Sequence, residues 1–126
     1  MKLLPVISIV DDDESVREAI EFLVRSLGYN ALTFRSAEEF LGSDQVSATF
    51  CLITDVQMPG LNGIELQDRL IAAGHRVPTI FISAFPSEKV ERRVLQNGAI
   101  GYLRKPFRED GLIKCINDAL KSAKDV

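Results

Sequence analysis

The chain has 126 residues, of which 46% are hydrophobic, so it can form one compact domain with a real core but hardly two. Its net charge of −3 argues against a surface for nucleic acid or an anionic membrane, because such surfaces gather Lys and Arg. No stretch approaches the roughly 20 apolar residues of a membrane span, and the first apolar run meets acidic residues too early for a signal peptide, so we expect a cytoplasmic domain.

Strand-like and helix-like patterns alternate along the whole chain. Residues 6–10 are a β-branched run, and residues 50–54 are nearly all apolar, as in a strand covered on both faces. Between such runs, apolar residues recur at helical spacing up to glycines that can end a helix. In chain order we expect strand 6–10, helix 16–27, strand 31–34, a short helix from Ser36 to about Gly42, strand 50–54, helix 64–73, strand 79–83, a helix between Ser87 and Asn97, strand 100–103 and a helix around 112–120.

Hydroxyl side chains mark the starts of two of these helices. Ser36 and Glu39 have the spacing of a capping box, in which each side chain accepts a hydrogen bond from the backbone N–H of the other. Ser87 can cap the fourth helix in the same position.

Five strand–helix pairs in alternation predict an α/β fold with a parallel sheet and helices on both faces. We expect the flavodoxin-like (βα)5 three-layer sandwich, with a five-stranded sheet of order 2-1-3-4-5. In such sheets ligands bind beyond the carboxyl ends of the strands, where the strand order reverses. The candidate functional residues should therefore stand directly after the strands.

Charged and hydroxyl side chains stand at four of the five predicted strand ends: Asp11 and Asp12, Asp55, Ser83, and Lys105. The first and third strands are neighbours in the expected order, so three carboxylates would be crowded together. Crowded carboxylates repel one another, and a hard divalent cation with oxygen ligands keeps them ionised. We expect this cation to be Mg²⁺, with Mn²⁺ as a possible substitute.

Each of these residue types has a chemical task in phosphoryl transfer. A metal-screened carboxylate at Asp55 is a competent nucleophile toward phosphorus and would form an acyl phosphate. The Lys105 ammonium and the Ser83 hydroxyl can stabilise the phosphoryl oxygens. A cis Lys105–Pro106 peptide bond would bend the chain and aim the lysine inward.

Each residue also has a structural interpretation. The acids after the first strand could cap a helix, and Lys105 could be a solvated surface lysine. It is the combination at four strand ends that favours a functional site. Cys51 and Cys115 lack metal-like spacing and are predicted to be small core residues, and His75 is predicted to be structural.

Four motifs in this order and spacing resemble the receiver domain of two-component response regulators: Val10-Asp-Asp12, Asp55-x-x-Met-Pro-x-x-Asn-Gly63, Ser83-Ala84 and Tyr102-x-x-Lys-Pro-Phe107. The resemblance predicts a single receiver domain over residues 1–126, with a core at about 6–120 and no output domain in this chain. Residues 36–41, Ser-Ala-Glu-Glu-Phe-Leu, further resemble the FixJ-like branch, whose receivers are often joined to a helix-turn-helix domain.

The resemblance implies that a sensor histidine kinase supplies the phosphoryl group and that Asp55 accepts it. Mg²⁺ would be bound by Asp12, Asp55 and the Gln57 main-chain carbonyl, with Asp11 acting largely through a bound water. Lys105, Ser83 and Ala84 would form the group that stabilises the phosphoryl oxygens.

Ser83 and Tyr102 match the switch pair of the family, in which the hydroxyl moves toward the phosphoryl group and the aromatic ring fills the vacated space. The changed surface would comprise the fourth helix, fifth strand and fifth helix. Through it the receiver would control an output, with transcription through an attached or partner DNA-binding domain as the leading expectation. Homodimerisation after phosphorylation is a further expectation, and turnover catalysis is not expected.

Alternatives stay open at the level of sequence. The chain could be a single-domain receiver that acts by protein–protein contact. A phosphatase of the haloacid-dehalogenase type also uses a strand-end aspartate, but it needs a second aspartate where Gln57 stands. In place of the glycine-rich loop common in the FixJ branch, this chain has Ala84-Phe-Pro-Ser87, and we hypothesise that Phe85 limits access of water to the acyl phosphate.

Overall fold

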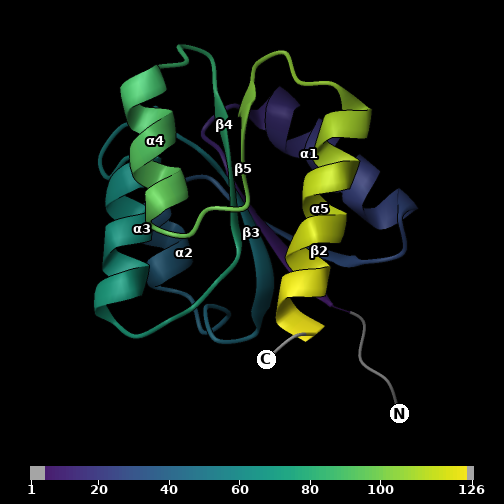
Figure 1. Cartoon of the computed structure of the whole chain (residues 1–126). Helices are drawn as coiled ribbons and strands as arrows, with labels where there is room; N and C mark the ends of the chain where they lie inside the picture. Colours follow the sequence, from purple (N-terminus) through teal and green to yellow (C-terminus); the bar gives the residue numbers. More distant parts are fainter. Residues whose placement is uncertain (1–4, 125–126) are drawn as a thin grey trace.

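The computed structural model describes residues 5–124 as a five-stranded sheet covered by five helices (Figure 1). The first and last helices begin earlier than the apolar periodicity indicates, because polar residues already form their first turns. The elements are β1 (Val6–Val10), α1 (Glu14–Ser26), β2 (Asn30–Phe34), α2 (Ala37–Leu41), β3 (Thr49–Asp55), α3 (Gly63–Ala72), β4 (Thr79–Ser83), α4 (Glu88–Gln96), β5 (Gly101–Arg104) and α5 (Glu109–Lys124).

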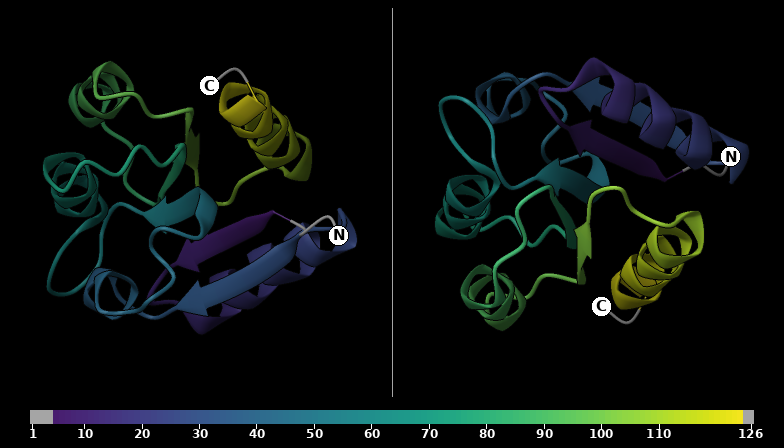
Figure 2. Two further views of the ribbon diagram at one scale, coloured as in Figure 1. Left: turned by 90° about the horizontal axis from the view of Figure 1, so that it is seen from below. Right: turned by 90° about the horizontal axis from the view of Figure 1, so that it is seen from above.

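All neighbouring strands pair in parallel, in the order β2-β1-β3-β4-β5. Helices α1 and α5 cover one face, and α2, α3 and α4 cover the other, as the two end-on views in Figure 2 show. This arrangement confirms the predicted flavodoxin-like sandwich and its strand order. Within residues 5–124, no helix combines the length and the apolar character needed to cross a membrane.

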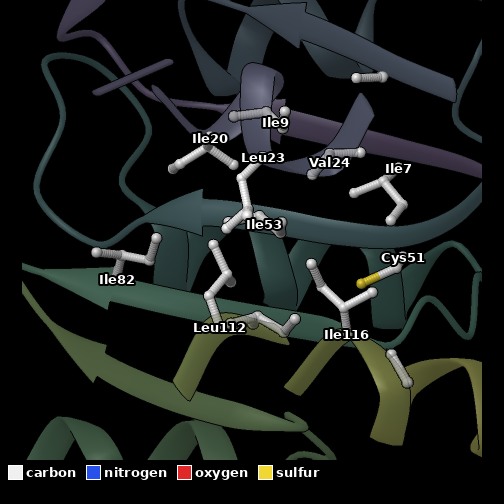
Figure 3. Packing of buried hydrophobic residues seen from close by; sticks show 13 residues of the cluster. Ile7, Ile9, Ile20, Leu23, Val24, Cys51, Ile53, Ile82, Leu112 and Ile116 are labelled. Carbon is white, nitrogen blue, oxygen red and sulfur yellow. The ribbon is translucent and has the colours of Figure 1, made fainter. Parts of the chain in front are cut away.

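The core lies on both faces of the central strand β3, which explains why residues 50–54 are almost entirely apolar. On one side Ile53 packs with Ile20 of α1 and Leu112 of α5 (Figure 3). On the other side Leu52 packs with Leu66 of α3 and with residues of α2. Both faces of β3 are covered by helices, so only the end of this strand is available for a functional site.

Both cysteines belong to this core, as predicted. Cys51 is fully buried on β3, and Cys115 of α5 is half-buried against the same cluster. Burial raises the pKa of the Cys51 thiol to about 12, and burial also raises the pKa of Cys115. Both thiols therefore stay protonated and unreactive at neutral pH.

The predicted capping box at α2 is half wrong. The Ser36 hydroxyl accepts a hydrogen bond from the Glu39 N–H at 3.0 Å, as expected. The Glu39 carboxylate, however, accepts from the N–H of Arg35, one residue earlier, and also lies near the Arg35 guanidinium. The Arg35 guanidinium, 3.9 Å from the second oxygen of Glu39, forms an exposed ion pair that adds only slightly to this choice of partner. A complete capping box is formed instead at α3, between Asn62 and Glu65.

The start of α3 is packed directly against the end of β3, and Gly63 makes this contact possible. The Gly63 N–H donates to the Val56 carbonyl at 2.9 Å. A Cβ added at Gly63 would lie 2.3 Å from the carbonyl oxygen of Asp55, a backbone atom that cannot turn away.

We therefore expect Gly63→Ala to lower the free energy of unfolding by about 1 to 3 kcal/mol, as overpacking does. Gly111→Ala in α5 is the matched control. The Cβ added at Gly111 would meet only Leu103 Cδ2, at an ordinary contact distance of 3.7 Å. The control should leave the stability unchanged or raise it slightly. Urea unfolding followed by circular dichroism measures both, and equal stabilities of Gly63→Ala and the parent would contradict the prediction.

Candidate functional site

The carboxyl ends of four adjacent strands form the candidate site. Strand pairing sets Val10 beside Thr54, so the residues that follow them, Asp11 and Asp55, lie side by side. Ser83 is the last residue of β4 and pairs with Arg104, which precedes Lys105. The sheet register thus brings together the strand-end residues that the sequence singled out.

Three carboxylates and one ammonium occupy the centre of this site. Asp11, Asp12 and Asp55 each offer an oxygen within 4.8 Å of the others. Asp11 and Asp55 are only 1% and 4% exposed, whereas Asp12 is exposed. The Lys105 ammonium lies 3.0 Å from Asp11 Oδ2 and 3.3 Å from Asp55 Oδ2, so the lysine points inward, as predicted. The Lys105–Pro106 peptide bond is cis, which was also predicted.

Asp11 is held more firmly than Asp55. Its Oδ1 accepts a hydrogen bond from the Asp13 N–H at 2.8 Å, and its main-chain carbonyl accepts from the Arg17 guanidinium at 2.8 Å. Asp55 Oδ1, in contrast, is buried and has no hydrogen-bond partner among the described residues. Asp55 therefore keeps one oxygen free to bind or attack a ligand.

Electrostatic crowding shows in the pKa values. Burial, and then the neighbouring charge of Asp11, raise the pKa of Asp55 from its ordinary 3.8 to about 6, although Lys105 acts in the opposite direction. Burial by itself would lower the pKa of Lys105. The hydrogen bond and charge of Asp11, followed by those of Asp55, outweigh burial and raise the pKa of Lys105 above its ordinary value.

These donors fit a hard divalent cation. All three are carboxylates, and one buried oxygen of Asp55 lacks a partner. Oxygen-only ligands and an excess of negative charge are the preference of Mg²⁺ and Mn²⁺ rather than of Zn²⁺. The role of the Gln57 main-chain carbonyl as a further ligand stays a prediction.

The side chain of Gln57 makes contacts that sequence reasoning missed. Its Oε1 accepts a hydrogen bond from the Ser83 hydroxyl at 3.1 Å. Its Nε2 donates to the main-chain carbonyl of Phe85 at 3.5 Å, and the Phe85 N–H donates to Ser83 Oγ at 3.1 Å. No sequence motif signals this network, because it depends on how the loops after β3 and β4 fold against each other.

Tyr102 lies beneath the start of α4. Its half-buried ring packs against a cluster that includes Val56, Phe81 and Val94. Its hydroxyl accepts a hydrogen bond from the N–H of Ser87, the N-cap of α4, at 3.2 Å. Tyr102 thus connects β5 to α4, and its movement as a switch residue stays a prediction.

The loop after Ser83 is largely exposed. Ala84 is exposed, and the Phe85 ring is 75% exposed, so it presents apolar surface beside the site. His75 lies before β4, at the opposite end of the strand from Ser83, and is half-buried. It takes no part in the candidate site, in agreement with its structural assignment.

Known proteins are related to this chain in sequence and in overall structure. A family profile described as "Response regulator receiver domain" matches residues 7–117. The response regulator protein TmoT of Ectopseudomonas mendocina is 43% identical over 118 residues, which are 94% of this chain and 54% of TmoT. The transcriptional regulatory protein FixJ of Bradyrhizobium diazoefficiens is 32% identical over 117 residues, 93% of this chain and 57% of FixJ.

Among solved structures, the response regulator StyR is 38% identical, with a TM-score of 0.90 over 98% of this chain and 62% of the StyR chain. The chain spans about half the length of the curated relatives that it matches.

The raised pKa of Asp55 leads to a prediction about stability. Ionised Asp55 disfavours the folded state above about pH 6, where the folded carboxyl has lost its proton. We expect Asp55→Asn to raise the free energy of unfolding at pH 7.5, in buffer with a metal chelator, by on the order of 1 to 3 kcal/mol. The stability gained by Asp55→Asn should shrink as the pH falls from about 6 toward 4. Over this range Asp55 of the parent is protonated in the folded state but still ionised in the unfolded state, so the parent loses its penalty.

Urea unfolding between pH 4.5 and 8 measures this difference. Glu18→Gln is the control, because it removes one exposed carboxylate of α1 and should show no such pH dependence. If the parent is more stable than Asp55→Asn at neutral pH, ionised Asp55 does not destabilise the folded state and the prediction is wrong.

Proposed function

The chain belongs to the family of response regulator receiver domains, and on this premise we propose that Asp55 accepts a phosphoryl group from a sensor histidine kinase in a Mg²⁺-dependent reaction. The observation that carries the proposal is the buried Asp55 carboxylate, which has one free oxygen and lies 3.3 Å from the Lys105 ammonium. Relatives named as response regulators and transcriptional regulators support it.

In the proposed transfer, one carboxylate oxygen of Asp55 attacks the phosphorus of a phosphohistidine on the kinase. The O–P bond forms as the P–N bond breaks, and the imidazole leaves with the electron pair and takes up a proton. The product is an acyl phosphate on Asp55. Bound Mg²⁺, held by Asp12, Asp55 and the Gln57 main-chain carbonyl, with Asp11 acting through water, would screen the negative charges during this step.

Two side chains of this chain can stabilise the phosphoryl group in this proposal. The Lys105 ammonium is already within ion-pair distance of Asp55 and can follow the charge onto the phosphoryl oxygens. The Ser83 hydroxyl can donate a hydrogen bond to the same group once it leaves Gln57. Ala84 directly follows Ser83 and completes this side of the site.

The signal would then pass to a surface formed by α4, β5 and α5. Movement of the Ser83 hydroxyl toward the phosphoryl group disturbs the loop that leads to α4, and Tyr102 responds beneath the same helix. We propose that this surface drives homodimerisation and controls transcription through an attached or partner DNA-binding domain. In this proposal residues 1–126 form one receiver domain that acts as a phosphoacceptor rather than a turnover enzyme, and control by protein–protein contact alone is the alternative.

Incubation with a small phosphodonor tests the central claim. Intact-mass spectrometry should show the addition of one phosphoryl group to the parent chain in the presence of Mg²⁺ and a loss of this adduct in chelator. Asp55→Asn should show no adduct, because it lacks the accepting carboxylate. An adduct that persists in Asp55→Asn, or that forms equally without a divalent cation, would refute the proposal.

The exposed ring of Phe85 yields a prediction about the lifetime of the acyl phosphate. If its bulk limits access of water, Phe85→Ala should speed dephosphorylation by about threefold, which is less than 1 kcal/mol of barrier. Phe22→Ala is the matched control, because Phe22 is similarly exposed, at 78%, but lies on α1. Loss of the phosphoryl adduct over time gives both rates, and an unchanged or slower rate in Phe85→Ala would disprove the role of the ring.

A further inference from the structure

A carboxylate from α2 is bonded to the loop that follows β3. Glu38 Oε2 accepts a hydrogen bond from the Leu61 N–H at 3.1 Å, although the two residues are 23 positions apart. The same carboxylate lies against Gly60, where an added Cβ would be 2.3 Å from Glu38 Oε2. Gly60 has a φ of +74°, a conformation that favours glycine, so the loop backbone can approach the carboxylate closely.

The contact holds a stretch of loop whose backbone makes few other hydrogen bonds, although the Gln57 side chain is bonded to Ser83 and Phe85 and Met58 is buried in the core. The loop is fixed at its start by the Val56 N–H, which donates to the Ile82 carbonyl at 3.0 Å, and at its end by the capping box of Asn62. Between these points, among the described residues, the Leu61 N–H to Glu38 is the one hydrogen bond that the backbone of 57–61 makes. Glu38 is therefore the main polar anchor of the middle of the loop.

Charge strengthens this anchor. The hydrogen bond from the Leu61 N–H, then that from the backbone of Glu38 itself, lowers the pKa of the Glu38 carboxyl below its ordinary value, and the nearby Arg69 adds to the effect. Glu38 is consequently an anion at neutral pH, and a hydrogen bond to an ionised acceptor is stronger than one between neutral groups.

We propose that Glu38 is a positioning residue for the metal site: it clamps the loop after β3 and so fixes the Gln57 main-chain carbonyl that would bind Mg²⁺. This inference rests on the proposed function, in which Gln57 is a ligand. Residues that orient the ligands of a metal, without touching it, tune its affinity. Glu38 acts in this way from a helix that contributes no ligand.

The neighbouring acid supplies a matched control. Glu39 lies in the same first turn of α2, is exposed like Glu38, and carries the same charge. Its carboxylate accepts a hydrogen bond from the Arg35 N–H and pairs with the side chain of Arg35. Glu39→Ala therefore removes the same charge from the same helix without releasing the loop.

Titration of the ¹⁵N-labelled chain with Mg²⁺, followed by NMR, tests the inference. We expect Glu38→Ala to raise the Kd for Mg²⁺ roughly threefold to tenfold, below the larger effects of residues that bond directly to a ligand. Glu38→Gln should show a smaller rise, because its amide oxygen can still accept from Leu61. Glu39→Ala should stay close to the parent.

A second readout needs no metal. In the metal-free chain, the Leu61 amide proton should move upfield in Glu38→Ala, because it loses its bond to a carboxylate, and should keep its position in Glu39→Ala. A parent that fails to bind Mg²⁺ would overturn the proposed function, and this inference with it. A parent that binds Mg²⁺ while Glu38→Ala binds equally well, or while Glu39→Ala is weakened as much, would overturn the inference alone.

Discussion

The burial of two carboxylates side by side is the constraint on which the rest of the site depends. Asp11 and Asp55 end up adjacent because β1 and β3 are neighbours in the sheet, and both are almost completely shielded from water. Lys105 lies within 3.3 Å of each, yet the pKa of Asp55 is still raised to about 6. The Lys105 ammonium therefore does not offset burial and the neighbouring charge of Asp11, and a bound cation would lower the pKa of Asp55 further.

The same constraint explains why Asp55, rather than another acid of the cluster, suits the proposed role of nucleophile. Asp11 has one oxygen bonded to the Asp13 N–H and the other near Lys105. Asp12 is exposed, so water competes for its oxygens. Asp55 Oδ1 is buried and has neither a hydrogen bond nor an ion pair among the described residues, whereas the equally buried Asp11 Oδ2 is paired with the Lys105 ammonium at 3.0 Å. A carboxylate oxygen without a competing hydrogen bond is better suited to attack phosphorus than one already bonded.

The strand-end residues could be predicted from sequence because strands impose direction. Once five strands alternate with helices, their carboxyl ends share one edge, and the side chains that follow them must meet there. The contacts of Gln57, Glu38 and Glu39 could not be predicted. Each is a side chain on an exposed loop or helix turn that can choose among several backbone amides, and such choices differ by only about 1 kcal/mol. They depend on loop conformations that no periodic pattern encodes.

The Ser83 hydroxyl shows how a small event at this edge can reach a helix. A hydroxyl has one proton, and here it is donated to Gln57 while the oxygen accepts the N–H of Phe85. A phosphoryl group on Asp55 would offer an ionised acceptor, which is roughly twice as strong as a neutral amide, so the hydroxyl would leave Gln57.

The loop between β4 and α4 has a second hydrogen bond two residues farther on, where the Ser87 N–H is bonded to Tyr102. If the hydrogen bond between Phe85 and Ser83 changes, we expect the nearby hydrogen bond between Ser87 and Tyr102 to change with it. Ser87 is the N-cap of α4, so the start of this helix would be affected. The proposed phosphoryl site and the start of α4 are thus connected by a single loop.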